Sequence, residues 1–251
     1  MSYSIESITE SIGARRMGNA PATIDWLLTD SRSLNFPEET LFFALTTKRN
    51  DGARYIADLY ARGVRNFVLS EESFRLMDNG QLTIDNAMQR DDAQSIVNYL
   101  IVPNPLKALQ KLAEQHRNRF QIPVIGITGS NGKTVVKEWL HQLLSPERAI
   151  IRSPRSYNSQ IGVPLSVWQM NEQSELAIFE AGISEPGEMR ALQNIIKPTI
   201  GILTNIGGAH QENFFSLQEK CMEKLTLFKN CDVVIYNGDD EFVSNCVAKS
   251  M

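Results

Sequence analysis

The chain has 251 residues, of which 42% are hydrophobic and 22% are charged, and its formal net charge is −4. This length is enough for one large domain or two ordinary ones, and the acidic balance argues against a nucleic-acid partner, whose phosphates require clustered Lys and Arg. The sequence lacks the roughly 18 consecutive apolar residues of a membrane span and the apolar core of a signal peptide. We therefore expect a cytoplasmic protein without a membrane partner. Its cysteines, Cys221, Cys231 and Cys246, show no C-x-x-C spacing and are expected to be reduced.

The segment up to about residue 100 has a mixed pattern that predicts a small α/β domain. Helices are expected over residues 4–12 and 53–61, and short apolar strands at 41–44 and 67–69. Pro103 and Pro105 then force extended backbone, which breaks any regular element. We place a domain boundary there and expect a first domain over residues 1–102 and a second over 103–251.

Beyond this boundary, apolar strands and amphipathic helices alternate regularly. Strands are expected near 124–127, 149–151, 176–179, 200–203 and 233–236, and helices near 106–119, 133–144, 187–196, 216–228 and from 240. Such alternation predicts a mostly parallel sheet covered by helices on both faces. The expected fold class is α/β.

The segment GITGSNGKT, residues 126–134, lies where the first of these strands meets the helix at 133–144. It looks like a phosphate-binding loop, but its spacing, G-x-x-G-K-T, is shorter than that of the Walker A loop. At such a junction, backbone N–H groups and the positive end of the helix dipole face a polyphosphate, Lys133 adds a mobile charge, and the Thr134 hydroxyl can ligate magnesium. The other interpretation is a glycine-rich turn that happens to contain Lys-Thr. The expected nucleotide contacts are Gly129, Ser130, Asn131, Gly132, Lys133 and Thr134.

Polar residues also follow the other expected strands, at the edge of the sheet where ligands of open α/β folds bind. Glu180 directly follows one strand, His210 follows another through a glycine turn, and Asn237 and Asp240 follow the strand at 233–236. Glu180 would be a hard oxygen ligand for magnesium, and His210 a second metal or phosphate contact. Taken singly, each could be a solvated or structural residue. Together with the loop, Glu180 and His210 favour a shared site.

Lys224 has an unusual place on the helix expected at 216–228. On a helical wheel it lies about 20° outside the apolar arc of that helix. An ammonium at this border must reach solvent, pair with an acid or be chemically neutralised. The pattern alone favours a side chain that reaches solvent.

Five segments, in this order, resemble the central ATPase domain of the Mur ligases: GITGSNGKT (126–134), NSQIGVPLSV (158–167), FEAGISEPGEM (179–189), TNIGGAHQENFFS (204–216) and EKLTLF (223–228). In the first domain, TDSR (29–32), ETLFFA (39–44) and RNDG (49–52) are similar to that family's UDP-substrate-binding domain. The resemblance covers nearly the whole chain. It implies an ATP-dependent ligase of peptidoglycan precursor synthesis with Mg²⁺ as cofactor.

Carried over position by position, the resemblance implies roles for individual residues. Lys133, Lys224 and His210 would act in catalysis, and Thr134, Glu180 and His210 would bind Mg²⁺. Lys224 would be the lysine that several Mur ligases carbamylate, although Thr226 departs from the pattern of relatives that carry Glu there. Asn237 and Asp240 match the adenine-side segment less closely. On the substrate side the resemblance points to Ser31, Arg32, Arg49 and Asn158.

The segments at 158–164 and 180–188 are most similar to the Mur ligases that add D-alanyl-D-alanine to UDP-N-acetylmuramoyl-tripeptide. In that reaction ATP phosphorylates the terminal carboxylate of the tripeptide, and the amine of D-alanyl-D-alanine attacks the acyl phosphate. Family members have a third, C-terminal domain, and in some bacteria they are fused to an alanine racemase. We expect this chain to lack the third domain and therefore not to catalyse ligation alone. The alternatives are a sister ligase, a folylpolyglutamate-synthase-like enzyme and a non-catalytic nucleotide-binding module.

Overall fold

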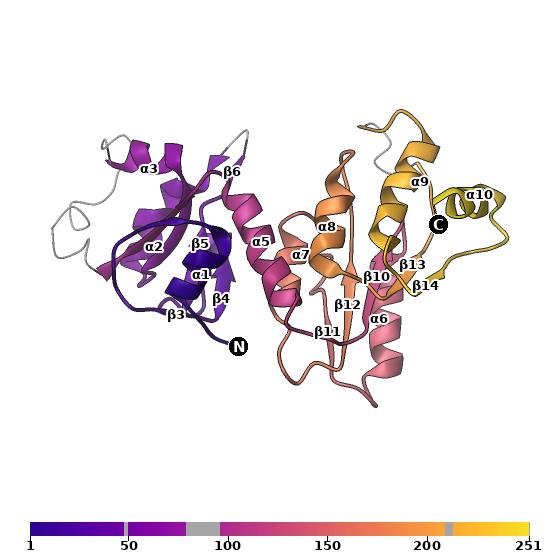
Figure 1. Cartoon of the computed structure of the whole chain (residues 1–251), viewed down its shortest axis with the longest axis horizontal. Helices are drawn as coiled ribbons and strands as arrows, with labels where there is room; N and C mark the ends of the chain where they lie inside the picture. The colour runs from indigo at the N-terminus through magenta and orange to yellow at the C-terminus, as the bar shows by residue number, and fades with distance from the viewer. Residues whose placement is uncertain (48–49, 79–95, 209–212, 251) are drawn as a thin grey trace. The chain divides into compact units, whose positions relative to one another are not determined.

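The computed structural model describes residues 1–47, 50–78, 96–208 and 213–250 (Figure 1). Two residues of the expected site, Arg49 and His210, lie outside these ranges. The chain divides into two compact units, Met1–Leu112 and Ala113–Met251. The division falls inside helix α5 (Pro105–Arg117), whereas the boundary expected from the two prolines lies just before that helix.

The first unit is built on a five-stranded sheet with the order β2-β9-β8-β5-β4, in which β2 is antiparallel to β9 and the other neighbours are parallel. Its strands are β2 (Arg15–Met17), β4 (Trp26–Leu28), β5 (Thr40–Phe43), β8 (Asn66–Ser70) and β9 (Asn98–Val102), with short pairs β1 (Tyr3–Ser4) and β3 (Thr23–Ile24), and β6 (Thr46–Thr47) and β7 (Asn50–Asp51). Its helices are α1 (Ile5–Ile12), η1 (Ser31–Ser33), η2 (Gly52–Tyr55), α2 (Ile56–Ala61) and α3 (Glu71–Asp78). The helix expected at 53–61 is thus a 3₁₀ turn followed by α2.

The second unit is built on a wholly parallel five-stranded sheet with the order β11-β12-β10-β13-β14. Its strands are β10 (Val124–Thr128), β11 (Ile150–Arg152), β12 (Leu176–Glu180), β13 (Ile200–Leu203) and β14 (Val233–Ile235). Its helices are α6 (Lys133–Leu144), α7 (Gly162–Val167), α8 (Glu188–Ile196), α9 (Leu217–Leu225), η4 (Thr226–Phe228) and α10 (Glu241–Ser250). The expected α/β class is confirmed, and the expected alternation gains one helix, α7.

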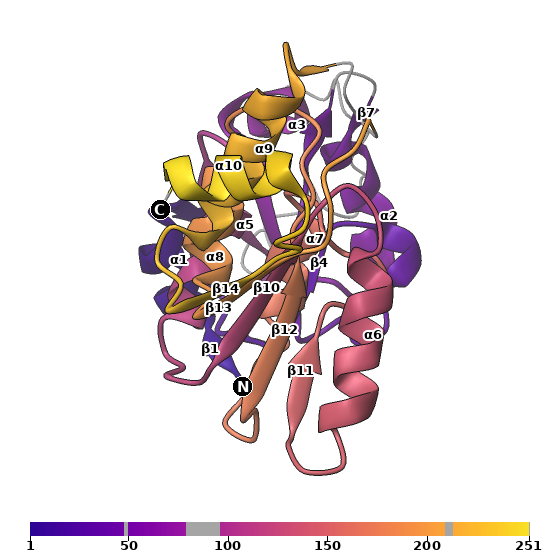
Figure 2. The same ribbon diagram turned by 90° about the vertical axis from the view of Figure 1, so that its right-hand side faces the viewer.

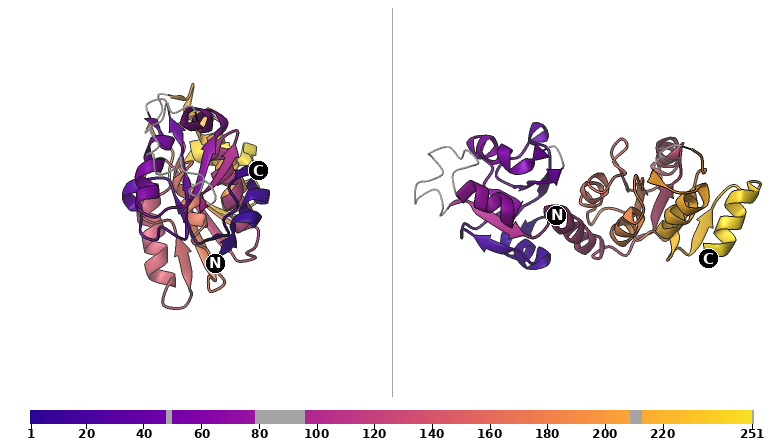
Figure 3. Two further views of the ribbon diagram at one scale, coloured as in Figure 1. Left: turned by 90° about the vertical axis from the view of Figure 1, so that its left-hand side faces the viewer. Right: turned by 90° about the horizontal axis from the view of Figure 1, so that it is seen from above.

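Helices cover both faces of the second sheet (Figures 1 and 2). On one face, α6 packs Val136, Leu140 and Leu144 against Ile127 and Ile178. On the other face, residues of α7, α8 and α9 form a larger core with the opposite side of β10 and β12, and α10 packs against α9 (Figure 3). Because all five strands run in the same direction, their carboxyl ends lie at one edge of the sheet, where the loops that follow them can form a common site. No helix in the described ranges is long and apolar enough to cross a membrane.

Candidate nucleotide site

The loop between β10 and α6 depends on glycine at both ends. Gly129 has φ 145°, and a Cβ on it would lie 2.0 Å from the side-chain Oγ1 of Thr204 and 3.0 Å from the carbonyl oxygen of Asn205, so the neighbouring loop leaves no room for a side chain. Gly132 has φ 79° at the N-cap of α6 and faces open space. A left-handed backbone at this point turns the chain directly into the helix. The loop therefore presents the start of α6 toward the carboxyl edge of the sheet.

A second loop, the residues after β13, fixes the shape of the first. Ser130 N donates to the carbonyl of Asn205 at 2.9 Å, and Asn131 N donates to Asn205 Oδ1 at 2.9 Å. Gly207 N donates to Ser130 Oγ, also at 2.9 Å. The N–H groups of Gly132 and of the first two residues of α6 are left with no acceptor in the described part of the chain. Free N–H groups at a helix N-terminus favour an anion.

Three lysine ammonium groups gather around this loop. Lys133 Nζ and Lys224 Nζ both donate to the carbonyl of Gly129, at 2.8 Å and 3.2 Å, and Lys220 Nζ donates to the carbonyl of Gly207 at 2.6 Å. Lys224 is only 3% exposed, so the expectation that its side chain reaches solvent is wrong. The carbonyl acceptors of Lys133 and Lys224 are neutral groups. The site consequently concentrates positive charge beside the free N–H groups.

Burial is the main cause that lowers the pKa values of these three lysines, and neighbouring lysine charges add to it for Lys133 and Lys224. Burial, followed by the charges of Lys133 and Lys220, lowers the pKa of Lys224 to about 7. Burial also lowers the pKa of Lys133, with Glu180 opposing the shift and Lys220 adding to it, and burial lowers the pKa of Lys220. A bound anion would offset the repulsion among these groups and raise their pKa values, because an opposite charge nearby favours the protonated form.

An acidic group lies at the same edge, next to the first turn of α6. Glu180 is fully buried at the end of β12, and its Oε2 accepts a hydrogen bond from Thr134 Oγ1 at 3.0 Å. Asn158 Nδ2 approaches the same oxygen at 3.5 Å, and Ser156 Oγ lies 3.2 Å from Thr134 Oγ1. The structure therefore brings together three residues that the sequence placed in the site: Thr134, Asn158 and Glu180.

Lys137 is a part of this arrangement that the sequence reasoning missed. Its Nζ lies 2.9 Å from Glu180 Oε1, and both side chains are fully buried. Oε1 nevertheless accepts no hydrogen bond of good geometry, so the contact is ionic and the oxygen keeps unused acceptor capacity. The signal for Lys137 in the sequence was its position one helical turn after Lys133, on the same face of α6.

These groups fit a nucleotide with magnesium. The free N–H groups and lysines suit phosphate oxygens, while the Thr134 hydroxyl and the incompletely satisfied carboxylate of Glu180 are hard oxygen donors of the kind that Mg²⁺ prefers. Within the described ranges no group of three or more His, Cys, Asp or Glu side chains gathers in a metal-binding arrangement. Mg²⁺ commonly uses one or two protein carboxylates together with substrate phosphates, so one buried glutamate fits that pattern.

Comparison with known proteins identifies this architecture. Residues 127–250 match the family model of the Mur ligase middle domain. The UDP-N-acetylmuramoyl-tripeptide–D-alanyl-D-alanine ligase of Borreliella burgdorferi is 32% identical over 89% of this chain and 47% of its own length. The chain belongs to the Mur ligase family. It spans about half the length of the curated relatives it matches.

Solved structures agree with this assignment. A crystal structure of MurF from Acinetobacter baumannii superimposes with a TM-score of 0.82 at 23% identity, covering 100% of this chain and 52% of that one, which supports the fold. MurF ligase from Thermotoga maritima, solved in complex with ADP, superimposes with a TM-score of 0.71 at 25% identity over 90% of this chain and 48% of that one.

Other residues expected in the Mur ligase site make local contacts. Asp240 Oδ1 accepts from Val243 N at 3.1 Å at the start of α10, and Asn237 Oδ1 accepts from Asp239 N at 3.1 Å. In the first unit, Arg32 pairs with Asp30 at 2.6 Å, and the carbonyl of Ser31 accepts from Arg62. The hydrogen bond and charge of Asp30 raise the pKa of Arg32, which is largely exposed. The roles that the resemblance implies for these residues stay predictions.

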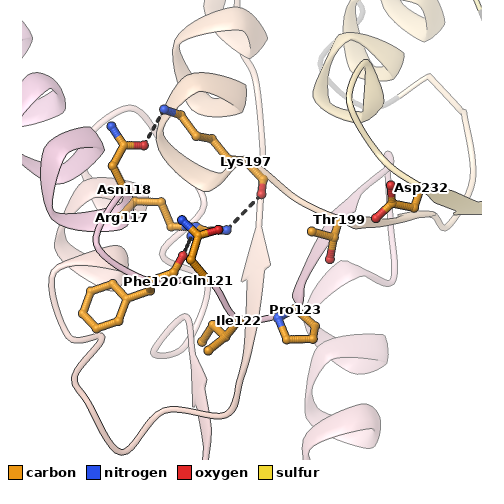
Figure 4. A pocket seen from close by; sticks show the side chains of 9 residues that line it. All are labelled: Arg117, Asn118, Phe120, Gln121, Ile122, Pro123, Lys197, Thr199 and Asp232. Atoms are coloured by element: carbon orange, nitrogen blue, oxygen red, sulfur yellow. Dashed lines mark hydrogen bonds between the residues drawn. The ribbon is translucent and has the colours of Figure 1, made fainter.

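A cavity of about 460 Å³ lies at the opposite edge of the Mur ligase middle domain, at the amino ends of β10, β13 and β14 (Figure 4). Its two cationic side chains are engaged in structural contacts. Arg117 donates to the carbonyls of Phe120, Ile196 and Lys197, and Lys197 Nζ donates to Asn118 Oδ1 at 2.6 Å. The nucleotide site is therefore better identified by its chemistry at the carboxyl edge than by the size of this cavity.

Proposed function

We propose that the second unit binds ATP with Mg²⁺. We further propose that the chain is part of an ATP-dependent ligase that adds D-alanyl-D-alanine to UDP-N-acetylmuramoyl-tripeptide in peptidoglycan precursor synthesis. The observation that carries the nucleotide part is the meeting of three lysines, the free N–H groups of α6 and the Thr134–Glu180 pair at one edge of the sheet. The names of the relatives support the proposal that the chain belongs to a ligase of this kind. The segments at 158–164 and 180–188 support D-alanyl-D-alanine as the added group over the amino acid that a sister ligase would add.

In this proposal the residues position groups and neutralise charge. ATP would supply the phosphoryl group that activates the tripeptide carboxylate as an acyl phosphate, and Mg²⁺ would offset the charge of the phosphates. Lys133 would leave the carbonyl of Gly129 to reach the phosphates, since its long side chain now folds back on its own loop. Thr134 and Glu180 would hold the metal. Asn158, which approaches Glu180, would lie on the substrate side.

Lys224 is proposed to be carbamylated, as its counterparts are in several Mur ligases. A pKa of about 7 leaves a large share of its amine neutral near neutral pH, and the neutral amine is the form that attacks carbon dioxide. The new N–C bond forms as the nitrogen loses a proton, which leaves a carbamate anion. Incubation with ¹³C-bicarbonate should give a carbamate carbon signal by NMR that is absent from Lys224→Met. A signal of equal intensity in that variant would refute the assignment.

The nucleotide proposal is tested by calorimetry with a non-hydrolysable ATP analogue in the presence of Mg²⁺. Lys133→Met should weaken binding by about tenfold or more, equivalent to about 1.4 kcal/mol, whereas Lys229→Met, on an exposed lysine, should not. Folded wild-type protein that shows no saturable binding would contradict the proposal.

The substrate proposal is tested by titrating UDP-N-acetylmuramoyl-tripeptide, with UDP-N-acetylmuramic acid as the control. Saturable binding that prefers the tripeptide would support the ligase assignment. Binding of neither compound by a folded sample would contradict the assignment of the first unit, and a nucleotide-binding module without ligase function would then become the better interpretation.

A further inference from the structure

Lys137 is the most deeply buried cation near the proposed site, yet it is not among the proposed nucleotide contacts. Its side chain has 0% exposure. Nζ lies 2.9 Å from Glu180 Oε1 and 3.1 Å from Glu138 Oε1, and it donates to the carbonyl of Ser153 at 2.8 Å and to that of Arg155. A buried ammonium is tolerated when it is paired and hydrogen-bonded in this way.

The partner carboxylate is held from several directions. Glu180 Oε2 accepts from Thr134 Oγ1, while Oε1 faces Lys137. The backbone N–H of Glu180 donates to Ser153 Oγ at 3.2 Å, and Ser153 is the same residue whose carbonyl accepts from Lys137. Lys137, Ser153 and Glu180 thus form a closed ring of contacts that joins α6, the residues after β11 and the end of β12.

We propose that Lys137 is a positioning residue that fixes the carboxylate of Glu180 beside Thr134 for magnesium. The inference rests on the proposed function of this site. With Oε1 anchored by the ammonium, the carboxylate cannot rotate away from the Thr134 hydroxyl, so the two oxygen donors stay together before the metal arrives. Outer partners of this kind orient metal ligands, and their loss commonly costs about 10- to 100-fold in metal affinity.

A purely stabilising role is the competing explanation. A buried ion pair is often no more stable than a well-packed apolar pair, so stability alone is a weak reason for a lysine here. The positions also matter, because Lys137 lies one turn after Lys133, and Glu180 contacts the residue that follows Lys133. The ion pair is therefore built into the same helical turn that carries the phosphate and metal contacts.

The test compares the affinity of a non-hydrolysable ATP analogue with Mg²⁺ and with EDTA, measured by calorimetry on the whole chain. The ratio of the two dissociation constants is the gain from Mg²⁺. Glu180→Gln sets the value expected when the ligand is lost, and Lys229→Met, an exposed lysine of the same unit, is the matched control. Lys137→Met should lower the Mg²⁺ gain by about tenfold or more while leaving the affinity in EDTA close to that of the wild type.

Several outcomes decide the matter. A double variant, Lys137→Met with Glu180→Gln, should show no loss of Mg²⁺ gain beyond that of Glu180→Gln alone, since both changes remove the same ligand. If Lys137→Met does not fold, Lys137→Gln carries the same test, because its amide still donates to the Ser153 and Arg155 carbonyls.

A lower melting temperature with an unchanged Mg²⁺ gain would overturn the proposal in favour of a structural role. Wild-type protein that binds no nucleotide would instead refute the proposed function.

Discussion

Replacing Lys224 by methionine should remove a pH dependence of stability that this buried lysine imposes on the second unit. The ordinary pKa of lysine is 10.5, and burial together with the charges of Lys133 and Lys220 lowers that of Lys224 to about 7. Between these two values the unfolded chain holds a proton that the folded chain has lost. The free energy of unfolding therefore rises with pH in this window, and the stability is lost as the pH falls through about 7.

The size of the effect follows from the same two values. One unit of pKa difference corresponds to about 1.4 kcal/mol, and the slope approaches this value per pH unit above the folded pKa. From about pH 6 to about pH 9, the wild-type chain should gain about 3 kcal/mol from this one group. Lys224→Met, whose side chain carries no charge, should be less pH-dependent by that amount.

Urea unfolding followed by tryptophan fluorescence can measure this difference. Trp26 belongs to the first unit, whereas Trp139 and Trp168 belong to the second, so a Trp26→Phe background makes the signal specific to the second unit. Lys229→Met, on an exposed lysine, is the control and should keep the wild-type slope. Equal pH slopes for the wild type and Lys224→Met would refute the view that Lys224 is a buried amine with a depressed pKa.

Four other substitutions test separate parts of the second unit by chemical denaturation and calorimetry. Gly129→Ala should lower the free energy of unfolding by about 3 kcal/mol or more and abolish nucleotide binding, because its Cβ would lie 2.0 Å from Thr204 Oγ1. Gly132→Ala has open space around it and should lower the free energy of unfolding by only about 1 kcal/mol, from its positive φ. Asp240→Ala should cost about 1 kcal/mol through the lost cap of α10, and a tenfold weaker nucleotide affinity in addition would support its adenine-side role. Arg117→Leu should destabilise the unit by about 3 kcal/mol, since it leaves buried carbonyls without a donor, but should not change nucleotide affinity, because it lies at the other edge of the sheet. A loss of affinity in Arg117→Leu at unchanged stability would contradict this placement.

The strands of the second unit could be predicted because they are short apolar runs of a buried parallel sheet. The expected strand at 200–203 coincides with β13, and that at 124–127 is one residue shorter than β10. Helix α7 was not predicted, since it has six residues and contains Pro164. That proline lies in the first turn, where a missing N–H breaks no helical hydrogen bond, so its usual meaning as a helix breaker is misleading.

Periodicity located α6 but could not say which of its faces is buried. The apolar residues of this helix form two adjacent stripes at i, i+4 spacing. Val136, Leu140 and Leu144 pack against the sheet, whereas Trp139 and Leu143 are 63% and 74% exposed. The two stripes differ by a rotation of about 100° around the helix axis. Because both have the same i, i+4 spacing, the sequence of the helix does not tell which stripe is buried. The position of the sheet relative to the helix, which comes from tertiary packing, selects one.

The burial of Lys224 likewise depends on contacts between elements. Phe228, one turn further along, packs where Gly201 of β13 has no side chain, and a Cβ there would lie 2.4 Å from its ring. Gly126, next to Gly201 in the sheet, leaves space for Pro198 and Leu227 in the same way. This close approach brings the end of α9 down onto the sheet and carries Lys224 under the phosphate loop. A helical wheel, which treats the helix alone, places the lysine at the border of the apolar face and cannot show that approach.

Lys133 and Lys137 show how the fold gives two similar residues different electrostatic roles. Both lie on one face of α6, but Lys137 is paired with Glu180, whereas Lys133 donates to the carbonyls of Gly129 and Ser130. A buried carboxylate without its own cation would draw on the charge of Lys133 and reduce the attraction for phosphate. Because Lys137 pairs with Glu180, less of the charge of that carboxylate is directed at Lys133, whose ammonium can then attract an anion. The same pairing keeps a carboxylate oxygen 3.0 Å from the Thr134 hydroxyl, so one ion pair serves both the phosphate and the metal side of the site.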